Sequence, residues 1–514
     1  MGVENISPIH RYDIIIIGGG LAGLTAGSKL AKAGKKVLLI EQHNVVGGCA
    51  TVFKRKREMI FEVGLHETGS VHNRSMYHDL EVYNQIEFVK VPEFFRLIRG
   101  QLDIILPDNV NEAKNSLSIQ FPEEKKAINK FFNDIINVRK QIKRLNWPIW
   151  KLIILFPILP LLLRNLIFNL NTNVGEYIDK LTKNEDLKLT LIGNLAYYHD
   201  DPYTTSYLFY ATGQASYLIG GGYFVKGGSQ KLSDALANTI TKYGGTIVLK
   251  HLVEEIIIEN KIAVGVKYRR QKRPTEGELI AYGKIIIANA AIPNVVNKLI
   301  PSMKNDEYTK QINSLELPCS LISIYIAFSE DISQLVDNRY STFIYNEEVN
   351  TLKDFTKFER NGDYLKKGMV FVNYDAIDNG LSTEKYHIAS ICAIDYIDNW
   401  KFKEKEEYKK RKDEVTQIFL EKLENTFPGI KKYVVYTEMS TPRTIERYTL
   451  NPNGIVYGFA QTPKQAMLNR RKYSKSPVKN LYFASAWGFP GGGFGGTIAG
   501  GYMTALKILK KDKD

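Results

Sequence analysis

One stretch near the start of the chain, RYDIIIIGGGLAGLTAGSKLAKAGKKVLLIEQ, constrains the fold more than any other part. Ile14 to Ile17 form a β-branched run, which is typical of a central parallel strand buried on both faces. A glycine turn with the pattern G-x-G-x-x-G follows, then a helical segment, 21–33, and a second strand, 37–40, that ends at Glu41. This order predicts a Rossmann-like dinucleotide-binding unit rather than an isolated glycine-rich turn.

Each of these residues has a separate physical task in such a unit. Gly18 permits the sharp turn, Gly20 lets the backbone approach a pyrophosphate, and Gly23 lets helix and strand touch. The free N–H groups at the helix N-terminus suit phosphates, and Glu41 can accept hydrogen bonds from ribose hydroxyls. We therefore expect these four residues to bind a dinucleotide.

Length, cysteine usage and charge exclude several other classes of protein. A chain of 514 residues suits two or more domains, and three widely spaced cysteines argue against a disulfide framework. No Cys/His cluster has zinc spacing, so we predict no metal site. The net charge of +14 suits an anionic partner, but the lysines are dispersed and mixed with acids, so we expect no nucleic-acid binding.

Two more blocks in the sequence have the features of a nucleotide-binding domain. In GGYFVKGGSQKLSDALANTITKYGGTIVLKHLVEEIIIENKIAVGVKY, Ser229 can cap a helix that Gly244 ends, and strands follow with a turn at 259–261. In NLYFASAWGFPGGGFGGTIAGGYMTALKIL, a strand at 481–484 leads into a glycine loop and a helix from about Thr497. A second dinucleotide fold is not expected there, because no acid-tipped strand follows.

The three blocks together resemble the FAD-binding proteins of the phytoene desaturase, carotenoid isomerase and retinol saturase family. Just past Glu41, NVVGGCATVFKRKREMIFEVGLHETG has that family's paired glycines, threonine, aromatic residue and Gly–His, with Glu62 where the family usually has Asp. The matching residues are Gly47, Gly48, Thr51, Phe61, Gly64 and His66.

The resemblance implies FAD as the cofactor and further residues that contact it. In the resembled proteins the residue at Val253 contacts the adenine through its backbone, and the last glycine loop and helix N-terminus face the flavin ring and pyrophosphate. In this chain that loop and helix start are represented by Gly493, Gly496, Thr497 and Ile498. Ala486 stands where many other FAD enzymes have an Asp that holds a ribityl hydroxyl, a loss that the carotenoid branch shares. NAD(P)H, if it is used, would have no Rossmann domain of its own.

The predicted fold class is α/β. We expect a discontinuous Rossmann-like FAD-binding domain of the glutathione reductase/amine oxidase type, built from 8–80, 220–300 and 475–514. An α+β substrate domain is then inserted as 81–219 and 301–474. The oligomeric state is left open.

No catalytic motif stands out, since the sequence has no Ser/His/Asp order or paired-carboxylate pattern of catalytic type. His66 and Glu67 follow a cofactor loop and could touch the flavin or act as acid and base, or could hold that loop by structural hydrogen bonds. Arg443 and Tyr448 are candidates to line the site, or could belong to a solvated strand end. The acidic pair at 200–201 is better explained as a turn before a proline.

Four functions agree with these features. The first is redox chemistry, saturation or desaturation, on carbon–carbon double bonds of a polyene or isoprenoid lipid. The second is flavin-dependent cis–trans isomerisation of such a polyene. The third is amine oxidation on the related fold. The fourth is non-enzymatic prenyl-lipid binding of the GDP-dissociation-inhibitor type, which the intact phosphate glycines argue against. A hydrophobic lipid is the expected small-molecule partner.

The segment NWPIWKLIILFPILPLLLRN does not belong to any of these blocks. Its apolar run, Leu152 to Leu163, is shorter than the roughly 20 residues that a bilayer crossing requires, and Pro157 and Pro160 interrupt it. Tryptophans and basic residues flank it, as at a membrane interface. We interpret 145–170 as a monotopic membrane-docking segment on the cytoplasmic side, with a buried core helix as the alternative. The basic residues are Arg139, Lys140, Lys143, Arg144, Lys151 and Arg164.

Overall fold

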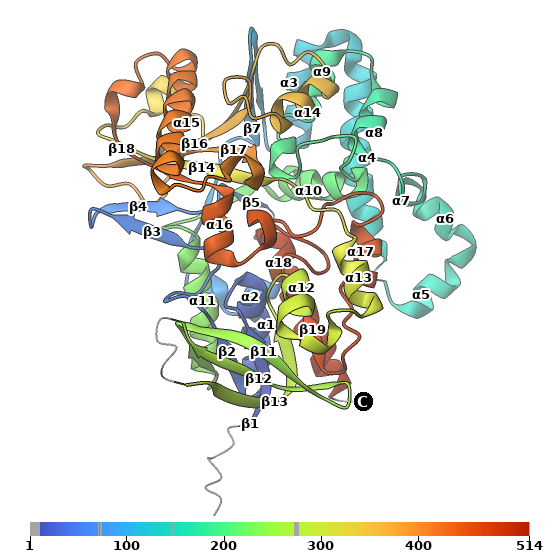
Figure 1. The fold of residues 1–514 in the computed structure, drawn as a ribbon. Helices are drawn as coiled ribbons and strands as arrows, with labels where there is room; N and C mark the ends of the chain where they lie inside the picture. The colour runs from blue at the N-terminus through green and yellow to red at the C-terminus, as the bar shows by residue number, and fades with distance from the viewer. Residues whose placement is uncertain (1–10, 70, 72–74, 146, 272–276, 513–514) are drawn as a thin grey trace, which may run out of the picture.

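The computed structural model describes residues 11–69, 71, 75–145, 147–271 and 277–512, and its ribbon shows two large sheets, one in each half of the molecule (Figure 1). The first sheet has the order β10-β2-β1-β13-β12-β11, with β19 paired to β13. Its strands are β1 (Arg11–Ile17), β2 (Val37–Ile40), β10 (Thr246–Val248), β11 (His251–Glu259), β12 (Ile262–Arg270), β13 (Leu279–Ala288) and β19 (Leu481–Phe483). These strands come from all three segments that were expected to form the nucleotide-binding domain.

The apolar run of β1 separates two hydrophobic cores. Ile14 and Ile16 belong to the core on the side of helix α1 (Leu21–Lys32), whereas Ile15 and Ile17 belong to the core on the opposite face. Successive strand residues point to opposite faces, so a strand with apolar residues at every position must be covered on both. The run therefore fixes β1 in the middle of the sheet.

Strand β13 changes partners along its length. Its first part pairs antiparallel with β12, from Leu279 to Tyr282, and its last three residues pair parallel with β19. On its other edge β13 pairs parallel with β1 from Tyr282 to Ala288. The sheet thus forks, and the strand near the C-terminus fills the gap that β12 leaves.

The second sheet has the order β18-β14-β17-β16-β15-β7-β8, and only β7 and β15 pair in parallel. Helix α15 (Lys405–Thr426) packs on one face, where Phe419 and Leu423 join Ile324 and Ile326 of β14 in one core. The strands are β7 (Phe95–Arg99), β8 (Leu102–Leu106), β14 (Ser320–Phe328), β15 (Ser341–Tyr345), β16 (Met369–Asn373), β17 (His387–Asp395) and β18 (Val434–Ser440).

Smaller elements connect the two sheets and cover their flanks. Strands β3 (Val52–Arg55) and β4 (Met59–Glu62) form a hairpin, and β5 (Thr68–Gly69), β9 (Gly222–Val225) and β6 (Phe88–Lys90) form a three-stranded sheet. The helices are α2 (Ser75–Asp79), α3 (Val110–Gln120), α4 (Lys125–Arg144), α5 (Ile149–Ile154), α6 (Leu159–Leu162), α7 (Arg164–Phe168), α8 (Val174–Leu181), α9 (Glu185–Leu191), α10 (Tyr207–Gly220), α11 (Ser229–Lys242), α12 (Ile292–Asn294), α13 (Glu307–Asn313), α14 (Leu352–Arg360), α16 (Pro442–Thr449), α17 (Met467–Tyr473) and α18 (Phe494–Lys511).

Helices α11 and α18 both pack on α1. Small residues make this close packing possible: a Cβ at Gly501 would lie 2.2 Å from the carbonyl oxygen of Ala22, and one at Gly27 would lie 2.8 Å from Ile240.

Three local expectations need correction. The last helix begins at Phe494 rather than near Thr497, and the strand before it ends at Phe483. Ser229 does not cap α11; Gly228 holds the cap position, and the Ser229 hydroxyl donates to Glu62 at 2.7 Å. A buried carboxylate from a distant strand thus takes over the helix start.

Across the residues that the structure describes, no helix has both the length and the apolar composition needed to cross a membrane.

A buried carboxylate, Asp395 at the end of β17, organises the interior beside the second sheet. It accepts hydrogen bonds from the Trp400 indole and the Tyr364 hydroxyl, both at 2.7 Å, and lies 4.0 Å from the buried ammonium of Lys367. Removing one partner from such a cluster leaves the others desolvated without compensation.

Replacing Asp395 with Ala should therefore lower the free energy of unfolding by about 3–5 kcal/mol, measured by urea titration of tryptophan fluorescence. The matched control is Asp398→Ala, whose side chain is 73% exposed and forms a surface ion pair with Lys401. This variant should unfold at the wild-type urea concentration. Equal effects of the two substitutions would show that the buried cluster does not stabilise the fold.

Candidate functional site

A cavity of about 1000 Å³ lies between the two large sheets. Ile17 and Ile40, at the carboxyl ends of β1 and β2, line it from the first sheet, and Tyr325, Val370 and Cys392 line it from the second. Ligands of open α/β sheets bind beside the carboxyl ends of the parallel strands. The cavity therefore occupies the place where a bound dinucleotide is expected.

The glycines of the first loop are required by close contacts within the protein as well as by the approach of a ligand. Gly18 has a φ of +93°, and a Cβ there would lie 2.6 Å from the carbonyl oxygen of Asn289. A Cβ at Gly20 would lie 2.9 Å from the Asn289 amide nitrogen, and one at Gly23 would lie 2.5 Å from Gly18 O. The Asn289 amide donates to Gly18 O at 3.0 Å. Asn289, directly after β13, is a functional position that the motif alone does not reveal.

Glu41 joins two backbone loops at the cavity wall. Its buried carboxylate accepts the Gly19 N–H at 2.7 Å and the His43 N–H at 2.8 Å. The Gly47 N–H in turn donates to Gly19 O at 2.7 Å, so the second glycine loop is attached to the first. Each carboxylate oxygen can accept a further hydrogen bond, which leaves Glu41 able to bind ribose hydroxyls.

Two helices begin at the cavity, α1 after Gly20 and α18 after Gly493. Within the described chain neither helix start has a side-chain cap, so backbone N–H groups there keep the capacity to bind an anion. Gly493 has a φ of +78°, and a Cβ on it would meet no protein atom within 4 Å. The residues present thus fit a dinucleotide whose pyrophosphate lies between two helix N-termini.

The structure places most of the predicted cofactor residues on the cavity wall but not all of them. Gly18, Gly20, Glu41, Gly47, Gly48, Val253, Ala486, Gly493, Gly496 and Thr497 line the cavity. Gly23 packs against Gly18, Ile498 is buried in the core, and the Thr51 hydroxyl donates to Gln230 instead. These three residues act on the cradle through packing or a neighbouring residue.

The catalytic candidates divide in the same way. Tyr448 lines the cavity, whereas Arg443 donates to the carbonyl oxygens of Trp400 and Phe402 at 3.2 and 3.0 Å and is not part of the lining. Asp200 is buried away from the cavity and accepts the Arg360 guanidinium at 2.6 Å. This contact supports the structural interpretation of the acidic pair at 200–201.

His66 and Glu67 lie together on the cavity wall, and burial favours the uncharged form of each side chain. Burial lowers the pKa of His66 to about 4, and its Nδ1 lies 3.0 Å from the Tyr197 hydroxyl. Burial raises the pKa of Glu67 well above its usual range, and the negative charges of Glu93 and Asp108 raise it further. Among the described residues, Glu67 Oε2 has no hydrogen-bond partner. Burial and the two neighbouring carboxylates therefore favour the protonated form of Glu67 at the cavity wall.

Aromatic and apolar side chains form the part of the cavity beyond the glycine loops. Tyr197 and Tyr198 lie just before the acidic pair at 200–201, and the others come from α10, the second sheet and the segment before α17. The sequence did not reveal that these rings meet. They are Tyr197, Tyr198, Phe209, Tyr217, Leu321, Tyr325, Val370, Ile394 and Tyr457.

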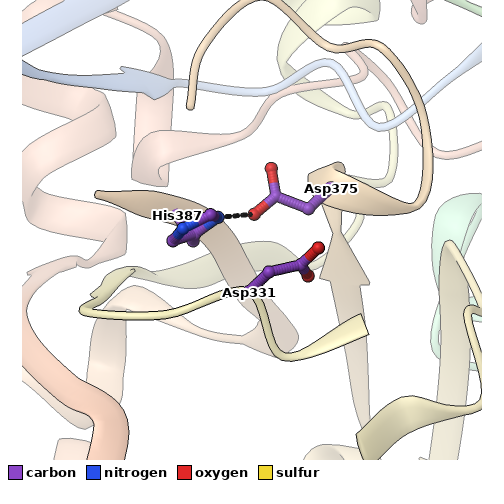
Figure 2. Close-up of side chains that lie close together, drawn as sticks. All are labelled: Asp331, Asp375 and His387. Atoms are coloured by element: carbon purple, nitrogen blue, oxygen red, sulfur yellow. Dashed lines mark hydrogen bonds and ion pairs between the residues drawn. The ribbon is translucent and has the colours of Figure 1, made fainter. Parts of the chain in front are cut away.

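A separate group of polar side chains, Asp331, Asp375 and His387, lies outside the cavity lining (Figure 2). His387 Nδ1 is 2.7 Å from Asp375 Oδ2, and Asp375 also accepts the Asn379 amide at 2.9 Å. Asp331 accepts the Ser333 N–H at 2.8 Å. These side chains bond within the protein, and we assign the group a structural role at the start of β17.

Comparisons with known proteins agree with this geometry. Residues 16–79 match the family described as NAD(P)-binding Rossmann-like domain. The chain is 25% identical to all-trans-retinol 13,14-reductase of Danio rerio, over 97% of this chain and 86% of that protein. It is 26% identical to the chloroplastic prolycopene isomerase of Daucus carota, over 97% of this chain and 80% of that protein.

A solved structure with the same fold is cyclohexylamine oxidase from Brevibacterium oxydans, with a TM-score of 0.64, 16% sequence identity and coverage of 98% of this chain and 100% of that one. The likeness confirms the predicted α/β fold class with a Rossmann-type domain, and at this identity it extends to the fold alone. The predicted resemblance is also confirmed: over nearly its whole length this chain is a relative of all-trans-retinol 13,14-reductases and prolycopene isomerases.

Proposed function

We propose that this protein is a FAD-dependent oxidoreductase that saturates or desaturates carbon–carbon double bonds of a polyene or isoprenoid lipid. The observation that carries the proposal is the continuity of one cavity, which joins the dinucleotide cradle to an aromatic and apolar lining. A flavin held in the cradle would have its reactive end beside that lining. The names of the relatives, which include retinol reductases and prolycopene isomerases, support a polyene as the substrate class.

The residues of the cradle have distinct roles toward FAD. The N–H groups at the starts of α1 and α18 suit the pyrophosphate, Glu41 suits the ribose, and the backbone at Val253 suits the adenine. Ala486 lines the cavity without a polar side chain, so a ribityl hydroxyl there must bond to backbone or water. When bound, FAD accepts or supplies the hydride equivalent that the reaction transfers.

The lining beside the expected flavin position favours an uncharged substrate. Tyrosine rings and aliphatic side chains predominate there, and burial favours the uncharged forms of His66 and Glu67. A cationic amine gains little in such a site, because its desolvation requires a compensating anion. A hydrocarbon chain needs no such compensation, so the lining supports a polyene over an amine.

Glu67 is the group best placed to move a proton. Saturation of a double bond adds one hydride equivalent and one proton, and a protonated carboxyl group on the cavity wall can provide the proton. Its raised pKa keeps it protonated at pH values where an exposed glutamate is ionised. We assign Glu67 the role of proton donor and Tyr197, which contacts His66, a role in shaping the wall beside it.

Flavin-dependent cis–trans isomerisation is the second candidate. It is favoured by the similar identity of this chain to a reductase and to an isomerase, 25% and 26%. Isomerisation without net redox would use the same cradle and the same apolar lining. The two functions therefore differ in whether electrons are transferred to or from the substrate overall, and not in the site.

Incubation with polyenes distinguishes these functions. Purified protein, with its flavin reduced or oxidised beforehand, is incubated anaerobically with retinoid and carotenoid substrates, and product mass is measured. We expect a gain of two hydrogens with reduced flavin or a loss of two with oxidised flavin. Unchanged mass with a shifted absorption spectrum would establish the isomerase instead. Bleaching of the flavin by primary amines and not by polyenes would refute both.

Gly493→Ala should weaken flavin binding, because the new methyl group would enter the cavity beside the start of α18. Gly244→Ala is a matched control: its φ is +80°, its Cβ would also meet open space, and it lies outside the cavity lining. Both variants should lose roughly 1–3 kcal/mol of stability through backbone strain at a positive φ. Only Gly493→Ala should lose flavin, measured as flavin absorbance per protein after gel filtration. Equal flavin contents would contradict the placement of the cofactor.

Glu67→Gln should keep the flavin and lower the rate of product formation about 10²–10⁴-fold, because glutamine has the shape of the neutral acid but gives no proton. The measurement is a single turnover with reduced flavin and an active polyene. Glu87→Gln, an exposed position, is the control and should react at the wild-type rate.

The same variant tests the protonation state directly. A carboxyl group whose folded pKa is raised stabilises the fold fully below its ordinary pKa of 4.5, and this stabilisation is lost as pH rises through the raised value. The melting temperature of wild type should therefore fall relative to that of Glu67→Gln as pH rises above 4.5. A constant difference would mean that Glu67 is ionised in the folded protein.

A further inference from the structure

Residues 147–170 form an arm that stands away from both sheets, at the right-hand edge of Figure 1. The arm holds the short helices α5, α6 and α7, with a tight turn at Phe156–Ile158. Its apolar side chains are unusually exposed, from 45% for Ile167 to 74% for Phe168. The exposed members are Trp150, Ile153, Ile154, Phe156, Ile158, Leu161, Ile167, Phe168 and Leu170. The alternative of a buried core helix is therefore wrong.

The arm is held in position by contacts at its base. Leu163 and Leu166 are buried in the main core, and the Leu166 N–H donates to the Gln141 side chain of α4 at 3.0 Å. Arg144 at the end of α4 donates to Leu162 O. One side of the arm thus packs on the protein. Because these contacts fix the orientation of the arm, the apolar residues on its other side face outward.

Charge indicates what covers this surface. No Asp or Glu occurs between Asp134 and Glu176, whereas six basic residues do. Lys151 lies 4.1 Å from the ring centroid of Trp147, so a cation and an interfacial ring lie side by side at the root of the arm. A second copy of the chain would bring the same positive segment and be repelled. An anionic lipid surface complements both the apolar tips and the basic root.

The base of the arm also reaches the candidate site. Arg139 and Ile142, in the last two turns of α4, line the cavity, and α4 continues directly toward the arm. Met467, at the start of α17, lines the cavity too. A lipid that leaves a bilayer beside the arm would therefore meet the cavity wall without crossing open water.

We propose that the arm 147–170 docks the protein on an anionic lipid bilayer, with its apolar tips among the acyl chains and its basic root at the headgroups. Its helices are too short, at four to six residues, to cross a bilayer. The docked arm places the cavity wall at Arg139 and Ile142 beside the bilayer. This last step rests on the proposed function, since it names the polyene as the lipid that enters.

Sedimentation with vesicles tests the docking without any substrate. Wild-type protein should pellet with vesicles of phosphatidylcholine and phosphatidylserine, and less with phosphatidylcholine alone or at high salt. The variant Ile153→Asp/Phe156→Asp/Leu161→Asp should partition at least about tenfold less. The control Ile119→Asp/Leu365→Asp changes apolar residues that are 82% and 64% exposed outside the arm, and should pellet like wild type.

Flavin content and the melting temperature of each variant establish that it is folded. Equal pelleting of the arm variant and wild type would overturn the proposal. The proposal would also fail if wild-type protein did not bind vesicles but formed dimers that the arm substitutions abolish. If the arm variant alone loses vesicle binding but wild type converts no polyene, docking stands and the proposed function fails.

Discussion

The site depends on one buried carboxylate that is bonded to backbone rather than to a cation. Glu41 accepts N–H groups from Gly19 and His43, and the loop at Gly47 is hydrogen-bonded to Gly19 in turn. Two flexible glycine loops are therefore held at one separation, which the ribose and pyrophosphate of a dinucleotide require. The start of α18 lines the same cavity.

Residues close in sequence to a glycine motif could be predicted, because their positions follow from local geometry. The strand, turn, helix and acid between Arg11 and Glu41 follow one another in the order of a Rossmann-like unit. The glycines of the last loop lie at the start of a second helix. Asn289 could not be predicted in the same way. Its role comes from the parallel pairing of β13 with β1, which brings its side chain over the loop of a distant segment.

Side-chain direction explains the remaining differences. Thr51 and Ser229 were expected at the cofactor and at a helix cap, yet Thr51 donates to Gln230 and Ser229 donates to Glu62. The tyrosines of the lining come from segments more than a hundred residues apart, so no periodicity along the chain reveals their meeting. The segment 145–170 was the opposite case: length, prolines and flanking charge predicted that it would not be an ordinary core helix, and the exposure of its side chains agrees.

The fork in the first sheet bears on the order in which the nucleotide-binding domain is completed during synthesis. Strand β19 fills the place that β12 leaves beside β13, and α18, which follows it, presents its first turn to the cavity. Both elements follow all others in chain order. During synthesis the ribosome therefore makes the larger inserted segments before the edge of the nucleotide-binding sheet is complete. The cradle is therefore complete only after β19 and α18 have been made, and a dinucleotide bound between the two helix N-termini would be enclosed after that point.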